Sequence, residues 1–143
     1  MACLPWRTGF LRSNVRMISL MIVDDSDDIR RMLRTVVADL ADPIYECRDG
    51  GEACDAYVTY RPDCVLMDIS MTPIDGMTAT RRIRQMFPEA RIVIVTQYDD
   101  ARLRRAGEQA GACGYVLKDN LFEVRRFLER SGQATIGMLR LGS

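Results

Sequence analysis

Short apolar runs recur along the chain and predict the strands of a sheet. They are rich in isoleucine, valine, leucine and methionine, and most of them are continuous rather than alternating. A short continuous run of this kind is typical of a strand that is buried on both faces of a parallel sheet. The five runs are residues 18–23, 44–47, 64–68, 91–96 and 114–118.

The segments between these runs carry helical periodicity. The clearest of them has one apolar face, which consists of Ile29, Met32, Leu33, Val36, Val37 and Leu40. Further helices are predicted over residues 52–61, 77–87, about 100–110 and 121–128. Strands that alternate with helices form a parallel sheet whose right-handed crossovers place helices on both faces. The pattern therefore predicts an α/β fold, a doubly wound five-stranded parallel sheet with five helices.

The composition is that of one ordinary globular domain. Hydrophobic residues make up 48% of the 143 positions, and 20 basic residues balance 20 acidic ones. A net charge of zero gives no general attraction to nucleic acid or to an anionic membrane. We interpret residues 1–16 as a disordered leader, 17–131 as the domain and 132–143 as a short tail. A transit peptide or a start at Met17 are the alternatives for the leader.

Cysteine and histidine usage narrows the chemistry. The five cysteines are odd in number and show no CxxC spacing, which favours reduced thiols in a cytoplasmic protein over a disulfide framework. No apolar stretch is long enough for a membrane helix. Histidine is absent, which excludes histidine metal ligands, histidine-activated nucleophiles and a phosphohistidine carrier. Carboxylates, hydroxyls, lysine or a bound metal must carry any chemistry.

Polar residues end four of the five predicted strands. Asp24 and Asp25 follow the first strand, Asp68 ends the third, Thr96 the fourth and Lys118 the fifth. In an open α/β sheet, ligands bind beyond the carboxyl ends of the strands. We therefore expect three acids, a hydroxyl and an ammonium at one rim of the sheet.

Three ionised carboxylates at one rim require a cation. Two of them about 4 Å apart repel by roughly 4 kcal/mol at an effective dielectric constant of about 20. Lys118 supplies one positive charge, and a pocket of oxygen ligands without histidine or cysteine suits Mg²⁺. The alternative for residues 25–28 is that they cap the following helix and favour its dipole, which we prefer for the last two of them. For Asp24 and Asp25 the other strand ends favour the metal.

Four segments in this order resemble the receiver domains of two-component response regulators. They are DD (24–25), VLMDISMTPIDG (65–76), IVIVTQYDD (92–100) and GACGYVLKD (111–119), and the resemblance extends over residues 18–130. It implies a flavodoxin-like, receiver-type fold and a role in phosphorelay signal transduction. It also implies a protein that catalyses only its own phosphorylation and dephosphorylation and is otherwise not an enzyme.

The resemblance implies an acceptor and a set of metal ligands. Asp68 would take a phosphoryl group from a phosphohistidine on a partner histidine kinase or phosphotransfer protein and become an aspartyl phosphate. Mg²⁺ would be held by Asp25 directly and by Asp24 largely through water. Asp68 and the backbone carbonyl of Ser70 would complete its protein ligands.

The resemblance also implies a switch. Thr96 and Lys118 would contact the phosphoryl group, and Tyr115 would then turn inward. This movement would change the face formed by the fourth helix, the fifth strand and the fifth helix, and so control an output. Ser70 and Tyr98 would tune hydrolysis, because they lie two positions past the acceptor and the threonine.

Two features bear on the output of such a receiver. Asp119 follows the lysine, where many receivers have proline, as it commonly does in receivers with LuxR-type DNA-binding outputs. Residues 132–143 are too few for a helix-turn-helix module. We expect a stand-alone receiver or the regulatory fragment of a DNA-binding transcriptional regulator, with no direct nucleic-acid contact by this chain. Mixed charges around the switch face favour a homodimer through it, or else form a solvated surface.

Other proteins that share this fold would need motifs that the chain lacks. An FMN carrier needs a phosphate-binding loop after the first strand, and a dinucleotide enzyme needs GxGxxG there, whereas the chain has Asp24 and Asp25. A haloacid-dehalogenase-type phosphatase would need its nucleophile on the first strand. The remaining alternative is a receiver-like interaction or dimerisation module that works without phosphorylation.

Overall fold

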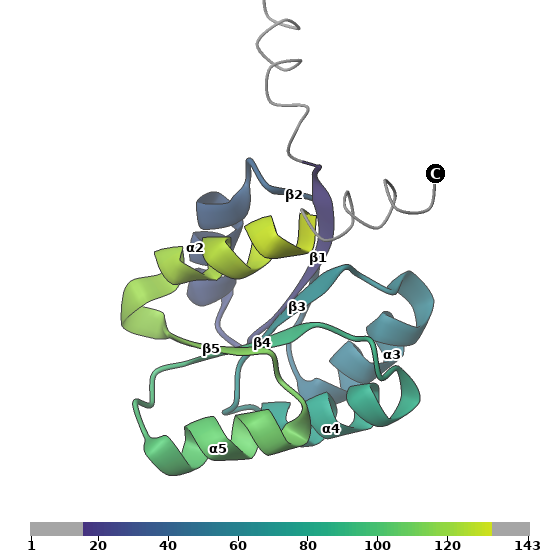
Figure 1. The fold of residues 1–143 in the computed structure, drawn as a ribbon, viewed down its shortest axis with the longest axis vertical. Coiled ribbons are helices and arrows are strands. Elements are labelled where there is room, and N and C mark those ends of the chain that lie inside the picture. Colours follow the sequence, from purple (N-terminus) through teal and green to yellow (C-terminus); the bar gives the residue numbers. More distant parts are fainter. Residues whose placement is uncertain (1–15, 133–143) are drawn as a thin grey trace, which may run out of the picture.

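A five-stranded parallel sheet forms the centre of the protein (Figure 1). The computed structural model describes residues 16–132, and the strand order is β2-β1-β3-β4-β5. The order reverses between β1 and β3, and ligands of open α/β sheets bind beyond the carboxyl ends of the strands at such a point. The strands are β1 (Ile18–Val23), β2 (Ala41–Cys47), β3 (Cys64–Met67), β4 (Ile92–Thr96) and β5 (Gly114–Leu117).

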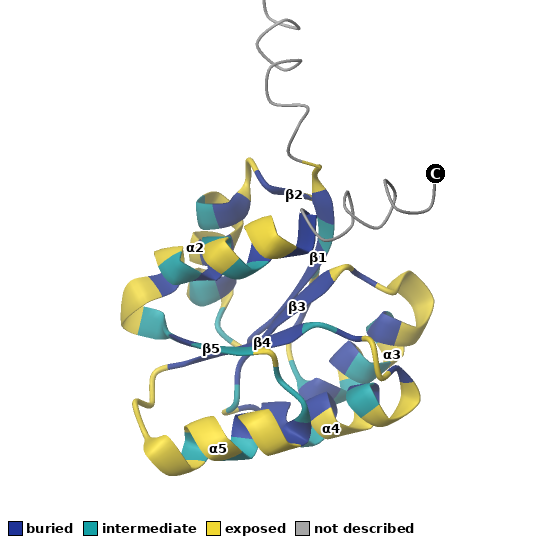
Figure 2. Ribbon diagram, viewed as in Figure 1, coloured by how far each residue is buried: buried dark blue, intermediate teal, exposed yellow. Residues whose placement is uncertain are grey.

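Helices cover both faces of the sheet and create two apolar cores (Figure 1). One face carries α3 (Gly50–Tyr60), α4 (Gly76–Met86) and α5 (Ala101–Ala110), and the other carries α2 (Asp27–Val37) and the last helix. Successive side chains of a strand point to opposite faces, so Met67 enters the first core and Leu66 the second. Figure 2 shows that β1, β3 and β4 are buried, as expected for a parallel sheet covered on both faces.

The predicted alternation of five strands with five helices is confirmed, and the differences lie at the ends of the elements. β2 begins at Ala41 rather than at residue 44, so it includes Asp42 and Pro43. These residues are tolerated because β2 is an edge strand, where polar and proline residues also block pairing with other chains.

The last helix and the face of α2 also differ from the prediction. The segment after β5 begins as a 3-10 helix (Lys118–Glu123) with a kink at Asn120, and an α-helix follows over residues 124–132. On α2 the buried stripe consists of Arg30, Leu33 and Val37. Met32 was predicted on the apolar face but is 52% exposed, because it lies beside this narrower stripe.

The cysteines that the structure describes are free thiols. They are Cys47, Cys54, Cys64 and Cys113. Burial raises the pKa of Cys47 to about 11 and that of Cys64 to about 12, so both stay protonated and unreactive at neutral pH. These two thiols therefore belong to the apolar cores rather than to a reactive site.

Two sequence predictions fall at the ends of the chain. The disordered leader and the short tail concern residues 1–15 and 133–143, which lie outside the part that the structure describes. Within the described part, no helix has the length and apolar character needed to cross a membrane.

Candidate functional site

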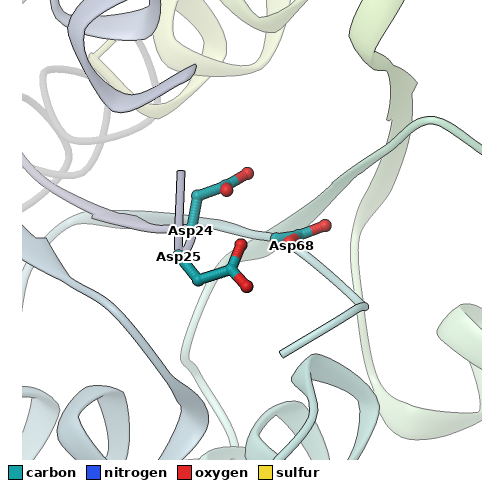
Figure 3. A group of neighbouring side chains, drawn as sticks. All are labelled: Asp24, Asp25 and Asp68. Atoms are coloured by element: carbon teal, nitrogen blue, oxygen red, sulfur yellow. The ribbon is translucent and has the colours of Figure 1, made fainter. Parts of the chain in front are cut away.

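The carboxyl ends of β1 and β3 bring three aspartates together. Val23 pairs with Met67, so the residues that follow them, Asp24 and Asp68, lie side by side. Asp25 completes the group, and one carboxylate oxygen from each aspartate lies within 4.8 Å of the others (Figure 3). Asp24 and Asp68 are buried whereas Asp25 is exposed. The cluster is therefore open to solvent on the Asp25 side.

Lys118 supplies the positive charge expected at this rim. It follows β5, and its Nζ lies 2.8 Å from Asp24 Oδ2 and 3.2 Å from Asp68 Oδ1. Asp24 Oδ2 is enclosed, and the Lys118 ammonium at 2.8 Å supplies its charged partner. The ammonium of Lys118 thus offsets part of the negative charge of the two buried carboxylates.

Burial changes the acidity of the cluster. It raises the pKa of Asp68 from 3.8 to about 6, and the charge of Asp24 adds to this rise, while Lys118 and the backbone N–H of Ser70 oppose it. Burial alone would lower the pKa of Lys118, but the two carboxylates outweigh burial and raise it. At neutral pH, Asp68 is therefore an ionised but poorly solvated carboxylate, which gains from any further cation.

The loop after β1 is fixed by the start of α2. Ser26 caps this helix: its Oγ accepts a hydrogen bond from the backbone N–H of Ile29 at 3.3 Å. Its own N–H donates to Asp24 Oδ1 at 2.8 Å. Of the alternative predicted for residues 25–28, capping by the aspartates is wrong, because the hydroxyl of Ser26 occupies the cap, whereas the favourable effect on the helix dipole agrees with the positions of the last two. Asp27 and Asp28 lie in the first turn, where negative charge favours the helix dipole.

Arg30 holds the backbone of the site and was not among the predicted site residues. This buried arginine donates from Nη1 to the backbone carbonyl of Asp24 at 2.7 Å and from Nε to Glu46 Oε1 at 2.8 Å. It also pairs with Asp27. A signal was present in the sequence, because Arg30 precedes Leu33 by three positions and so falls on the buried stripe of α2. An arginine rarely occupies such a position unless it is paired.

The segment after β3 closes tightly on Asp68. A Cβ atom at position 76 would lie 1.8 Å from the backbone oxygen of Asp68, so only glycine allows α4 to begin here. Asp75 caps α4 by accepting a hydrogen bond from the backbone N–H of Thr78 at 2.9 Å, and the N–H of Gly76 donates to Ile69. The backbone that follows Asp68 is therefore held in place.

Thr96, Tyr98 and Tyr115 form a second group beside the cluster. Thr96 is buried at the end of β4, and its Oγ1 accepts a hydrogen bond from the backbone N–H of Tyr98 at 3.2 Å. The hydroxyl of Tyr115 donates to the backbone carbonyl of Tyr98 at 2.6 Å. The backbone of Tyr98 thus links the threonine to the tyrosine, although Tyr98 itself is 42% exposed.

The donor set of the acidic cluster fits a hard divalent ion. Three carboxylates offer oxygen ligands within reach of one another, and the absence of histidine from the sequence removes the competing preference for softer metals. Asp25 keeps the site accessible from solvent. Asp24, Asp25 and Asp68 would hold such an ion, and the role of the Ser70 carbonyl stays a prediction.

The sheet carries three aspartates and a lysine at the point where its strand order reverses. This arrangement is typical of one class of signalling domain, and comparison with known proteins identifies the family of this chain. Residues 20–130 match the response regulator receiver domain, and the chain belongs to this family. It is 32% identical over 111 residues to the chemotaxis protein CheY of Bacillus subtilis, covering 77% of this chain and 91% of CheY.

Longer regulators and solved structures are also similar. The chain is 30% identical to the transcriptional regulatory protein DegU of Brevibacillus brevis over 83% of its own length, but it spans only 53% of DegU. A LuxR-family two-component response regulator from Aurantimonas sp. SI85-9A1 superimposes with a TM-score of 0.72 at 28% identity, covering 88% of this chain and 99% of that chain. The predicted fold and receiver family are therefore confirmed.

Proposed function

We propose that Asp68 receives a phosphoryl group from a phosphohistidine on a partner histidine kinase or phosphotransfer protein, in a Mg²⁺-dependent reaction. The observation that carries this proposal is a buried carboxylate with two further carboxylates beside it and an ammonium 3.2 Å away. Membership of the receiver family supports the same function in phosphorelay signalling. We place the protein in the cytoplasm on the same grounds.

The proposed chemistry needs little covalent assistance from the protein. An oxygen of Asp68 forms a bond to phosphorus while the bond from phosphorus to the donor's histidine nitrogen breaks. The carboxylate is ionised above its pKa of about 6, so no general base is required. Mg²⁺ supplies neutralisation of the charge on the phosphoryl oxygens. Asp24, Asp25 and Asp68 would hold the ion together with the backbone carbonyl of Ser70, and Lys118, now paired with Asp24 and Asp68, would contact a phosphoryl oxygen.

The same site supports a conformational response. The hydroxyl of Thr96 donates a hydrogen bond to a phosphoryl oxygen, which alters its contact with the backbone N–H of Tyr98. Since Tyr115 donates to the backbone carbonyl of the same residue, a change at Thr96 reaches the tyrosine through one residue. The response then appears on the face of α5, β5 and the final helix, where a homodimer or another partner binds.

The output of this receiver follows one of two arrangements. It acts through a separate partner, or it is the regulatory part of a DNA-binding regulator, as the length of DegU allows.

Sedimentation velocity of the phosphorylated and unphosphorylated chain tests the homodimer. A sedimentation coefficient that rises to that of a dimer on phosphorylation supports it, and an unchanged sedimentation coefficient contradicts it.

The central experiment is phosphorylation by a small phosphodonor, with and without Mg²⁺, followed by intact-protein mass spectrometry. The mass of one phosphoryl group should be gained only with Mg²⁺, and Asp68→Asn should not gain it. Asp55→Asn, on the exposed side of α3, is the matched control and should react like the wild type. Equal phosphorylation of Asp68→Asn would refute the acceptor, and no phosphorylation of any form would favour an interaction module that works without it.

A further inference from the structure

Arg30 makes three different contacts from one buried guanidinium. It lies in the first half of α2 and is only 7% exposed. Nη1 donates to the backbone carbonyl of Asp24, Nε donates to Glu46, and Nη2 pairs with Asp27. Each nitrogen therefore serves a separate acceptor, a geometry for which the planar guanidinium is suited and an ammonium is not.

The contact with Asp24 is made to the peptide between the two metal-site aspartates. The carbonyl of Asp24 belongs to the peptide bond that joins it to Asp25, so its orientation sets the directions in which both side chains leave the backbone. The Asp24 N–H is fixed by the carbonyl of Cys47 at 3.1 Å. Arg30 supplies the matching restraint at the other end of the residue.

The exposed aspartate depends most on this restraint. Within residues 16–132, the Asp25 carboxylate accepts no hydrogen bond from the protein, whereas Asp24 is held by Ser26 and Lys118. Its position therefore follows from the backbone alone. The backbone is anchored in turn to β2, because Glu46 lies opposite Ile22 in the sheet and also binds Arg34 at 2.9 Å.

We propose that Arg30 is a positioning residue for the divalent-cation site: by holding the Asp24–Asp25 peptide against β2 it aims both carboxylates at one ion. The inference rests on the proposed function in taking this cluster as a Mg²⁺ site. It assigns to Arg30 no contact with the ion or with the phosphoryl group.

Electrostatics alone would give Arg30 the opposite effect. A positive charge near a cation site repels the cation, so removing the guanidinium would strengthen Mg²⁺ binding if charge were decisive. Two carboxylates, on Asp27 and Glu46, already offset that charge. Loss of positioning therefore outweighs relief of repulsion, and the sign of the change in affinity separates the two effects.

The experiment compares Mg²⁺ dissociation constants of the full chain by NMR amide-shift titration. Arg30→Met should raise the dissociation constant about tenfold, the size typical of losing a group that orients metal ligands. Arg30→Lys keeps the charge but cannot make all three contacts, and should fall between Arg30→Met and the wild type. Arg31→Met should bind like the wild type, since Arg31 is exposed and pairs only with Asp28 among the described residues.

A second control separates positioning from stability. Leu33 is buried on the same helix and packs in the apolar core beneath it, so Leu33→Ala should lower the melting temperature without changing the dissociation constant. An equal loss of affinity in Leu33→Ala would overturn the proposal, as would unchanged or tighter binding in Arg30→Met.

A variant of a residue that Arg30 contacts keeps the proposal testable if Arg30→Met does not fold. Glu46→Gln weakens the anchor on β2 and should raise the dissociation constant by a smaller factor in the same direction. An unchanged constant in that variant contradicts the proposal. Absence of Mg²⁺ binding by the wild type would refute the metal site itself and the positioning role with it, an outcome distinct from wild-type binding that Arg30→Met retains.

Discussion

The hydroxyl of Tyr115 lies 2.6 Å from the backbone carbonyl of Tyr98 and donates a hydrogen bond to it. This bond ties the edge strand β5 to the segment between β4 and α5. The guanidinium of Arg104 also covers the Tyr115 ring, and its Cζ atom lies 4.5 Å from the ring centroid. The hydroxyl of the tyrosine is therefore hydrogen-bonded, and one face of its ring is covered.

Removing the Tyr115 hydroxyl should loosen this segment. Tyr115→Phe loses one partly exposed hydrogen bond, so the free energy of unfolding should fall by about 1 kcal/mol. Amide hydrogen exchange in residues 97–100 should become faster. Tyr60→Phe is the control, because Tyr60 stacks on Tyr45 at the opposite edge of the sheet. If Tyr60→Phe accelerated hydrogen exchange in residues 97–100 equally, the prediction would be contradicted.

The side chain of Tyr98 should slow hydrolysis of the aspartyl phosphate. It follows Thr96 by two positions and stands 42% exposed, so it can obstruct water that approaches the rim. Tyr98→Ala keeps the backbone carbonyl that Tyr115 binds and should release inorganic phosphate faster than the wild type once the phosphodonor is removed. A dephosphorylation rate equal to that of the wild type would show that the ring does not obstruct water.

Lys118 should not be replaceable by arginine. It is the single lysine among 20 basic residues, and its ammonium fits between two buried carboxylates. A guanidinium is broader and prefers bidentate contacts. Lys118→Arg should fold and become phosphorylated on Asp68 but lose the change at Tyr115, measured by the shift of its ring resonances on phosphorylation. Retention of the full shift would mean that Lys118 is only a structural ion pair.

Ionisation of Asp68 should lower the free energy of unfolding, measured without Mg²⁺, once the pH exceeds the pKa of this residue. Its pKa is about 6 in the folded state, above the ordinary value of 3.8, so the folded state holds the proton more tightly than the unfolded state. The resulting stability is present below pH 3.8 and is lost as the pH rises through about 6, a change of about 3 kcal/mol. Asp68→Asn mimics the neutral form and should therefore be more stable than the wild type at about pH 8.

Urea unfolding in a chelator measures this difference. The advantage of Asp68→Asn should shrink as the pH is lowered toward about 4, because wild-type Asp68 is then largely protonated in the folded state and no longer carries a buried charge. Mg²⁺ at about pH 8 should stabilise the wild type more than the variant. An advantage that is the same at both pH values would mean that ionisation of Asp68 is not its cause.

Much of the fold was predictable because its signals are local. Buried parallel strands produce continuous apolar runs, and four of the five predicted runs match their strands to within one residue at each end. β2 was less clear because an edge strand tolerates Asp42 and Pro43. The kink at Asn120 depends on how the segment after Lys118 turns back over the sheet, which no periodicity records.

The site was predictable where it depends on strand ends and not where it depends on packing. The carboxyl ends of parallel strands share one edge of the sheet, so the meeting of Asp24, Asp68 and Lys118 followed from the order of the elements. The bonds of Arg30 join α2 to β2, and such pairings depend on side-chain reach. The raised pKa of Asp68 likewise requires the depth of burial that only three dimensions reveal.

The contact between position 76 and the carbonyl of Asp68 limits how this domain can evolve or be redesigned. Since even a methyl group there would overlap the backbone oxygen, α4 cannot shift independently of the strand that precedes Asp68. Every sequence that keeps this helix start must keep glycine. Surface changes elsewhere on α4 are free to accumulate, so the helix can acquire new partners while its first residue stays packed against the backbone carbonyl of Asp68, the proposed acceptor.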